Sequence, residues 1–224
     1  MTLLRAVIVM DYQNVHLTAH ELFAKHSALP KHESLIHPLH FANQIIRVRN
    51  VKQLPGHAHA ELTKLLVYRG EPSPEHNPNG QRRNQMQKAE WERDPRVKVT
   101  LRPLKYDYEY DASGRPATDG SGKKILKGPP REKGIDVLCA LALVREARLE
   151  DNDVVILAAQ DTDLVPALDE AIKLNRAKIE TFSWYEPSRP QGRQQLRPSN
   201  GRSIWNTRLG GTEFTNCKDT NDYT

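Results

Sequence analysis

The chain has 224 residues, of which 38% are hydrophobic, and it carries a formal net charge of +5 with a pI of about 9.2. That length allows a substantial core in one or two domains, and the excess basic charge favours polyanionic partners. The two cysteines, Cys139 and Cys217, exclude a disulfide framework. No stretch approaches the roughly 20 apolar residues of a membrane span, and no secretory signal is visible, so we expect no membrane partner and a cytoplasmic location.

The first half of the chain alternates between predicted strands and helices. Residues 5–10 form a β-branched apolar run, which is typical of a strand buried on both faces. Helical spacing of apolar residues follows over 32–51, and a second strand is predicted over 62–68. A loop over 71–80 leads to a polar helix over 81–93, which Asp94-Pro95 ends. Residues 97–104 alternate and predict a third strand.

The second half repeats this alternation after an interruption. Residues 106–131 are rich in glycine, proline and charge, which predicts an irregular or hairpin-like excursion. A helix is predicted over 135–149, with Cys139 as a buried free thiol, then a second fully buried strand over 153–160. A helix over 164–174 and a last strand over 178–184 follow. We therefore predict one domain over 1–186 and a basic, Pro/Gly-rich C-terminal extension over 187–224.

Strands that alternate with helices predict an α/β fold, in which a central, mainly parallel sheet is flanked by helices in three layers. Right-handed crossovers place the carboxyl end of each strand and the start of the next helix at the same edge of the sheet. Ligands bind at that edge in open α/β sheets. Residues far apart in sequence are therefore expected to meet there.

Four aspartates fall at this predicted edge. Asp11 ends the first strand, Asp161 and Asp163 follow the second buried strand, and Asp136 starts a helix. Each alone is explained by capping of helix N–H groups. Together they repel one another unless a cation lies among them. Carboxylates are hard ligands, so the set predicts Mg²⁺ or Mn²⁺, which lowers the pKa of a bound water and stabilises charge on a phosphate.

Several neighbours are candidate site residues. Asn14 either orients a ligand or caps the next helix, and Thr162 either supports a ligand carboxylate or caps. Lys133 either meets a substrate phosphate or is solvated. Arg82 and Arg83 are predicted to bind the nucleic-acid backbone, with the further basic residues Lys88, Lys123, Lys124, Lys127, Arg131, Arg189, Arg193, Arg197 and Arg202.

Other residues have two interpretations. Tyr106, Tyr108 and Tyr110 either stack on unpaired bases or belong to an alternating edge strand. Glu71 is either a fifth acid at the edge or a solvated loop residue. His16 and His20 have the spacing of zinc ligands on a helix, but a third ligand is not near in sequence, which favours a solvated or capping role.

Three motifs in order resemble the NYN domain of the PIN-like nuclease superfamily. They are Asp11-Tyr12-Gln13-Asn14, Lys133-Gly134-Ile135-Asp136 and Asp161-Thr162-Asp163, and the resemblance covers roughly residues 4 to 185. It implies a PIN-like (Rossmann-like) fold and endonucleolytic cleavage of RNA with one or two Mg²⁺ or Mn²⁺ ions, leaving 5′-phosphate and 3′-hydroxyl ends. By position, Asp11, Asp136, Asp161 and Asp163 would be metal ligands, with Asn14 in or next to the ligand set. Gln160 and Leu164 depart from the family pattern around the last motif.

The leading hypothesis is a metal-dependent endoribonuclease that acts on single-stranded or structured RNA. A homo-oligomer is the candidate assembly. The alternative is a non-catalytic RNA-binding or regulatory module with the same fold. A Toprim or haloacid-dehalogenase-like phosphotransferase also uses Asp-x-Asp after a strand. A haloacid-dehalogenase-like enzyme needs that motif on the first strand, where this chain has Asp11 and Gln13. A Toprim enzyme needs a glutamate at the end of an earlier strand, and no convincing one is present.

Overall fold

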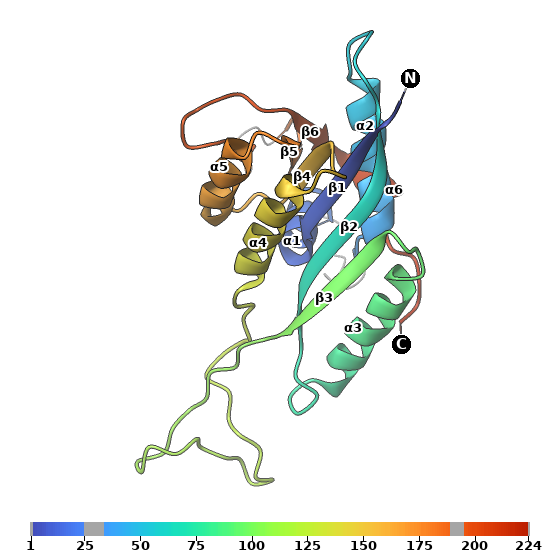
Figure 1. Ribbon diagram of the computed structural model, residues 1–224. Helices are drawn as coiled ribbons and strands as arrows, with labels where there is room; N and C mark the ends of the chain where they lie inside the picture. The colour runs from blue at the N-terminus through green and yellow to red at the C-terminus, as the bar shows by residue number, and fades with distance from the viewer. Residues whose placement is uncertain (1, 25–33, 189–194, 224) are drawn as a thin grey trace.

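A single sheet of six parallel strands forms the centre of the molecule (Figure 1). The computed structural model describes residues 2–24, 34–188 and 195–223. The strand order is β3-β2-β1-β4-β5-β6, and every neighbouring pair is parallel. The strands are β1 (Leu4–Asp11), β2 (Ala60–Glu71), β3 (Val97–Pro103), β4 (Val154–Ala158), β5 (Lys178–Trp184) and β6 (Asn206–Leu209). The predicted α/β class with a parallel sheet is therefore confirmed.

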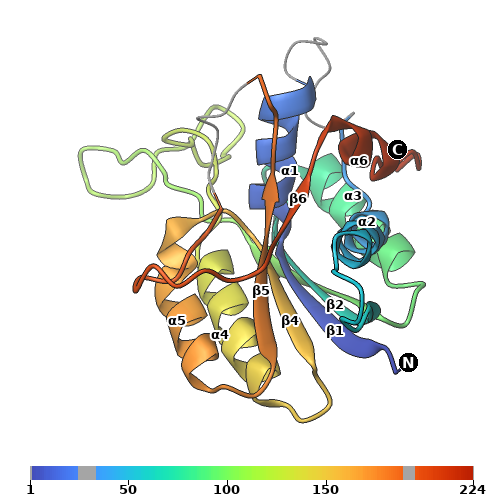
Figure 2. The same cartoon turned by 90° about the horizontal axis from the view of Figure 1, so that it is seen from above.

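Helices cover both faces of the sheet, which makes three layers (Figure 2). On one face α4 (Ile135–Arg148) and α5 (Val165–Lys173) pack on Val9, Val155 and Leu157. The other face is covered by α1 (Tyr12–Ala19), α2 (Pro38–Val51), α3 (Pro78–Trp91) and α6 (Gly211–Asn216). A π-helical turn (His20–Ala24) extends α1, and a 3-10 turn (Thr162–Leu164) precedes α5.

The central strands are apolar throughout because both of their faces are buried. Ala6, Ile8 and Met10 of β1 point into one core layer while Val9 points into the other. All five residues of β4 are buried. Continuous apolar runs are typical of strands in a parallel sheet, and this is the signal that the sequence carries at 5–10 and 153–160.

The order of the strands reverses between β1 and β4. The chain runs outward from β1 to β2 and β3, then crosses back to β4 beside β1 and continues outward to β5 and β6. A crevice forms at such a reversal, outside the carboxyl ends of the two central strands, and it is the usual ligand site of this architecture. Asp11 ends β1 there, and Asp161 follows β4.

Two sequence-based expectations are wrong in detail. Residues 34–37 precede α2 and are not helical: Ile36 instead pairs with Lys218 in an isolated antiparallel bridge. The strand at 178–184 is not the last one, because β6 pairs with it and α6 follows. β6 and α6 both lie within the predicted C-terminal extension, and their residues Leu209 and Phe214 are buried in the core. A four-residue strand in a Pro/Gly-rich segment has too few residues to show a period.

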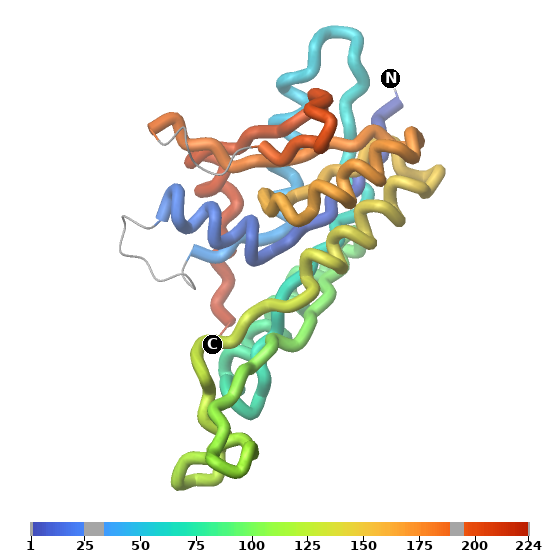
Figure 3. The backbone as a smooth tube through the Cα atoms, turned by 90° about the vertical axis from the view of Figure 1, so that its left-hand side faces the viewer, coloured from blue at the N-terminus to red at the C-terminus, as the bar shows by residue number. Residues whose placement is uncertain are grey.

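Residues 105–131, here called the arm, project from the carboxyl edge of the sheet between β3 and α4 (Figures 1 and 3). Its base is closed by paired backbone bonds between Lys105 and Arg131, of 2.8 and 3.0 Å. The described pairing within the arm consists of isolated bridges. Among the described residues, we find no helix with the length and apolar character that crossing a bilayer requires.

Candidate functional site

Asp11 has two local roles. It is the last residue of β1 and the N-cap of α1, where its Oδ1 accepts a hydrogen bond from the Asn14 N–H at 3.0 Å. Only 6% of the residue is exposed. The pKa of Asp11 is raised to about 6, chiefly by burial and also by the charges of Asp161 and Asp136, against the opposing backbone hydrogen bonds. An aspartate that is costly to ionise beside two others is a candidate cation ligand.

A cavity of about 240 Å³ opens beside Asp11 at the strand reversal. Four acidic residues line it: Asp11, Glu21, Glu132 and Asp161. Gln13, Asn14, Leu17 and Thr18 of α1 complete the lining. The end of β1, the π-helical turn after α1, the residue just after the arm and the loop after β4 therefore supply one acidic cavity.

Asn14 ties two loops of this cavity together. Its Oδ1 accepts a hydrogen bond from the Gln160 N–H at 2.8 Å, and Gln160 Oε1 in turn accepts from the Trp184 N–H at 3.1 Å. Asp11, not Asn14, is the residue that caps α1. Of the two interpretations of Asn14, the capping role is wrong, and the residue holds the end of β1 against the loop after β4.

The four predicted aspartates are brought together to different degrees. Asp136 is half-buried in the first turn of α4 and close enough to Asp11 to raise its pKa. Asp161 lines the cavity and caps the 3-10 turn, where its Oδ1 accepts from the Asp163 N–H at 3.1 Å. Asp163 and Thr162 are exposed on that turn and do not line the cavity.

Glu132 is a site residue that the sequence did not reveal. Its Oε1 accepts a hydrogen bond from the Gly70 N–H at 2.5 Å, and burial raises the pKa of Glu132 to about 7, with the charge of Asp11 adding to the effect. A Cβ at residue 70 would clash with Leu104 and lie 2.7 Å from Glu132 Cγ, so a larger residue there would displace the Glu132 side chain. The sequence signal that could have identified Glu132 is its position two residues before Gly134, the N-cap of α4.

The donor set suits a hard divalent cation with few protein ligands. Among residues 2–24, 34–188 and 195–223, no three His, Cys, Asp or Glu side chains are arranged to hold one metal ion. Mg²⁺ commonly takes one or two carboxylates and completes its shell with water and substrate phosphate. Asp11 and Asp161, with Asp136 and Glu132 nearby, fit that description.

The predicted basic residues occupy different surroundings. Lys133 is exposed, and its backbone oxygen accepts from Arg102 Nε at 2.6 Å. Arg82 is exposed on α3, whereas Arg83 is half-buried and lines a second cavity. Arg197 and Arg202 are exposed, and Arg189 and Arg193 lie outside the described residues.

The arm tyrosines are not equally free to meet bases. The rings of Tyr106 and Tyr108 lie 4.7 and 5.7 Å from that of His76, and Lys124 Nζ lies 5.3 Å from the Tyr108 ring centroid. Tyr110 is 66% exposed. Of the three, Tyr110 presents the free aromatic face.

Glu71 and the two histidines have local partners. Glu71 accepts hydrogen bonds from Gln81 and Gln85 of α3 and does not line the acidic cavity. His20 Nδ1 lies 2.8 Å from Ser34 Oγ, and the His16 ring lies 5.8 Å from that of Tyr12. Both histidines are buried. In the described part of the chain they belong to no metal-binding group.

Comparison with known proteins leaves the family open. No protein-family model matches the sequence, and no curated protein matches it. The crystal structure of a protein of unknown function from Vibrio parahaemolyticus is similar over 80% of each chain, with 20% sequence identity and a TM-score of 0.43. At that identity the likeness defines neither an activity nor a ligand, and the NYN resemblance stays a prediction.

Proposed function

We propose that the protein is a metal-dependent endoribonuclease whose site is the acidic cavity at the end of β1. The observation that carries this proposal is the burial of Asp11 next to Asp161, Asp136 and Glu132 at the strand reversal. Asp11 and Asp161 would hold Mg²⁺ or Mn²⁺, with Asp136 and Glu132 reached directly or through water. The net charge of +5 supports a polyanionic substrate.

When bound, the ion would lower the pKa of a water molecule and stabilise the charge that builds on the scissile phosphate. The chain supplies the rest of the arrangement. The bond from Gln160 to Asn14 fixes the two loops that carry Asp11 and Asp161. Lys133 is exposed next to Glu132 and is free to meet a phosphate of the strand. Asp163, which does not line the cavity, would act at most through water.

The test is cleavage of single-stranded RNA with Mn²⁺, repeated with Asp11→Asn and Asp161→Asn. We expect each substitution to reduce the rate on the order of 100-fold, as loss of a metal ligand or its support does. Asp151→Asn is the matched control, because its side chain is 95% exposed just before β4, at the other end of that strand. Cleavage that survives in both site variants would show that the site is wrongly assigned.

Metal binding is measured separately by thermal unfolding. An ion that binds only the folded chain stabilises it by about 2.7 kcal/mol at 100 times its dissociation constant. We expect Mn²⁺ to raise the melting temperature of the wild type and of Asp151→Asn, and not that of Asp11→Asn.

The second candidate is a non-catalytic RNA-binding module. The observation that favours it is that no three carboxylates among the described residues converge as ligands. Such a module would bind RNA with a steep salt dependence, unchanged by EDTA and without turnover.

A further inference from the structure

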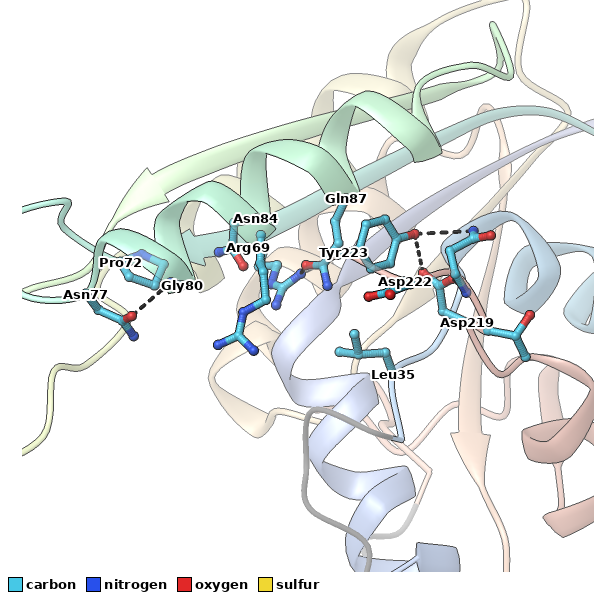
Figure 4. Close-up of a pocket in the computed structure, with 13 residues that line it drawn as sticks. Leu35, Arg69, Pro72, Asn77, Gly80, Asn84, Gln87, Asp219, Asp222 and Tyr223 are labelled. Carbon is cyan, nitrogen blue, oxygen red and sulfur yellow. Dashed lines mark hydrogen bonds between the residues drawn. The ribbon is translucent and has the colours of Figure 1, made fainter.

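A second cavity, of about 450 Å³, lies between β2, α3 and the segment 219–223 (Figure 4). Arg69 comes from the end of β2, while Arg83, Asn84 and Gln87 come from α3. Asp219 and Tyr223 also line the cavity, and in Figure 4 they lie at the opposite end from Asn77 and Arg69. Its volume lies within the range of small-molecule sites.

Arg69 is held in place by aromatic rings rather than by a carboxylate. Its guanidinium carbon lies 4.6 Å from the Tyr12 ring centroid and 5.7 Å from that of Trp91, and its Nη1 donates to Gln87 Oε1 at 2.5 Å. Burial lowers the pKa of Arg69, and the charge of Arg83 acts in the same direction, while Tyr12 and the charge of Glu132 oppose the change. Within the described residues, neither arginine forms an ion pair with a carboxylate. Asp219 and Asp222 also line this cavity, and two guanidinium groups that are not in an ion pair with them favour an anion.

The opposite end of the cavity has different chemistry. Asp219 Oδ2 accepts hydrogen bonds from Trp91 Nε1 and the Tyr223 hydroxyl, both at 2.8 Å, so its position is fixed. Carboxylates at this end disfavour a second phosphate and suit the N–H donors of a nucleobase. The Tyr223 ring and the amides of Asn84 and Gln87 supply further flat and polar groups.

Contacts of residues 69 and 70 link the surroundings of the two cavities. The guanidinium of Arg69 lies over Tyr12, the residue after Asp11, and Tyr68 pairs with Asp11 across β2 and β1. The next residue, Gly70, donates its N–H to Glu132 of the acidic cavity. An RNA strand that lies along this edge of the sheet would therefore reach both cavities.

We propose that the second cavity binds one nucleotide of the RNA strand next to the scissile bond, with its phosphate on Arg69 and Arg83 and its base toward Asp219 and Tyr223. This subsite rests on the proposed function, because it takes the acidic cavity as the place of cleavage. The subsite gives Arg69 and Arg83 a phosphate-binding role. Arg82 of the same helix has no such role, because it does not line the cavity.

The experiment measures the affinity of the full chain for a labelled six-nucleotide single-stranded RNA in EDTA over a range of salt concentrations. We expect Arg83→Ala to weaken binding about tenfold and to lower the salt slope by about one, the effect of one lost phosphate contact. Arg93→Ala is the control, since Arg93 lies two residues past the end of α3, its side chain is 77% exposed and it does not line the cavity. It should leave the affinity within about twofold.

Arg69→Gln should weaken binding at least as much as Arg83→Ala. Because Arg69 is packed on two rings, thermal unfolding of this variant must accompany the measurement, and Arg83→Ala decides if Arg69→Gln does not fold. A nucleoside 5′-monophosphate should compete with the RNA, and the matching nucleoside should compete less. Equal loss in Arg83→Ala and Arg93→Ala, or no loss in Arg83→Ala, overturns the subsite.

The outcomes separate the two proposals. If no RNA is cleaved with Mn²⁺ but binding in EDTA depends on Arg83, the subsite stands and the nuclease proposal fails. If cleavage depends on Asp11 while Arg83→Ala binds and cleaves like the wild type, the nuclease proposal stands and the subsite fails.

Discussion

Asp11 illustrates how one residue serves both fold and site. As an N-cap it accepts a backbone hydrogen bond, which stabilises its ionised form, yet burial and two neighbouring aspartates raise its pKa to about 6. The folded protein therefore holds this charge at a cost when no cation is present. A cation at the cavity would remove that cost, which links the stability of the chain to its proposed ligand.

This cost predicts a pH-dependent gain in stability for Asp11→Asn. The pKa of Asp11 is higher in the folded chain than the ordinary value of 3.8, so stability falls as the pH rises from about 4 to about 6. Asparagine does not ionise and still accepts the capping bond. We expect Asp11→Asn to raise the free energy of unfolding by about 1–3 kcal/mol at pH 7.5 in EDTA, and to have little effect at pH 4, measured by urea unfolding.

Asp94 provides a control of opposite sign. Hydrogen bonds from Arg96 lower the pKa of Asp94 to about 2. Its contribution is present above pH 3.8 and is lost as the pH falls through about 2. Asp94→Asn should therefore destabilise the chain at pH 7.5, by less than about 1 kcal/mol because the pair is near the surface. A higher free energy of unfolding at pH 7.5 for Asp94→Asn, or a lower one for Asp11→Asn, would contradict the stated directions in which the two pKa values move.

At the scale of elements, the arm is built from two similar turns. Asp111 Oδ1 accepts from Ser113 and Arg115, and Asp119 Oδ1 accepts from Ser121 and Lys123 in the same pattern. Gly114 and Gly122 take the left-handed conformation in these turns, with φ of 76° and 82°. Three backbone bonds then join residues 109, 117 and 125 in a ring. In each turn an exposed aspartate accepts the hydrogen bonds that hold the turn, and the same turn carries a basic residue.

The arm is expected to serve RNA affinity rather than stability. We predict that replacing residues 109–125 with a short glycine-rich turn changes the free energy of unfolding by less than about 1 kcal/mol, because no described arm residue belongs to the core clusters. The removed segment has three basic residues (Arg115, Lys123, Lys124) and three acidic ones (Glu109, Asp111, Asp119), so the net charge is unchanged. RNA affinity should fall about tenfold, because the replacement removes three exposed basic side chains that can contact phosphates.

The paired backbone at Tyr108 and Leu126 makes this replacement feasible, because the two ends already lie side by side. Glutamine at Arg115, Lys123 and Lys124 should lower RNA affinity to the same degree with the turns intact. Binding that is unchanged in both variants, measured by fluorescence anisotropy, would remove the arm from the RNA surface.

At the scale of the whole molecule, the C-terminal region completes the sheet and the core. β6 covers the edge of β5, and Leu209, Phe214 and Cys217 are at most 3% exposed. Backbone bonds from His37 to Cys217 and from Asp219 to Leu35 then tie the region to the segment before α2. The segment 219–223 also forms one wall of the second cavity.

Truncation after residue 186 is therefore expected to unfold the protein. Loss of the three buried side chains alone costs on the order of 5 kcal/mol, which is comparable with the total stability of an ordinary domain. Phe214→Ala is the milder test and should cost about 3–5 kcal/mol in urea unfolding. A truncated chain that unfolds cooperatively at the wild-type midpoint would show that residues 187–224 are a separate extension, as the sequence first suggested.

The sequence by itself determined the α/β class, the buried strands and the edge at which Asp11, Asp136 and Asp161 meet. Apolar runs and helical periods are local signals, and right-handed crossovers turn them into one shared edge. Only the tertiary structure decided that Asp163 stays outside the lining of the cavity, that Glu132 enters it, and that Arg69 and Arg83 share a second cavity. These outcomes depend on how side chains pack across non-adjacent elements, which local patterns do not encode. For the same reason β6 was missed: its four residues are a strand because β5 offers an edge and the core buries Leu209.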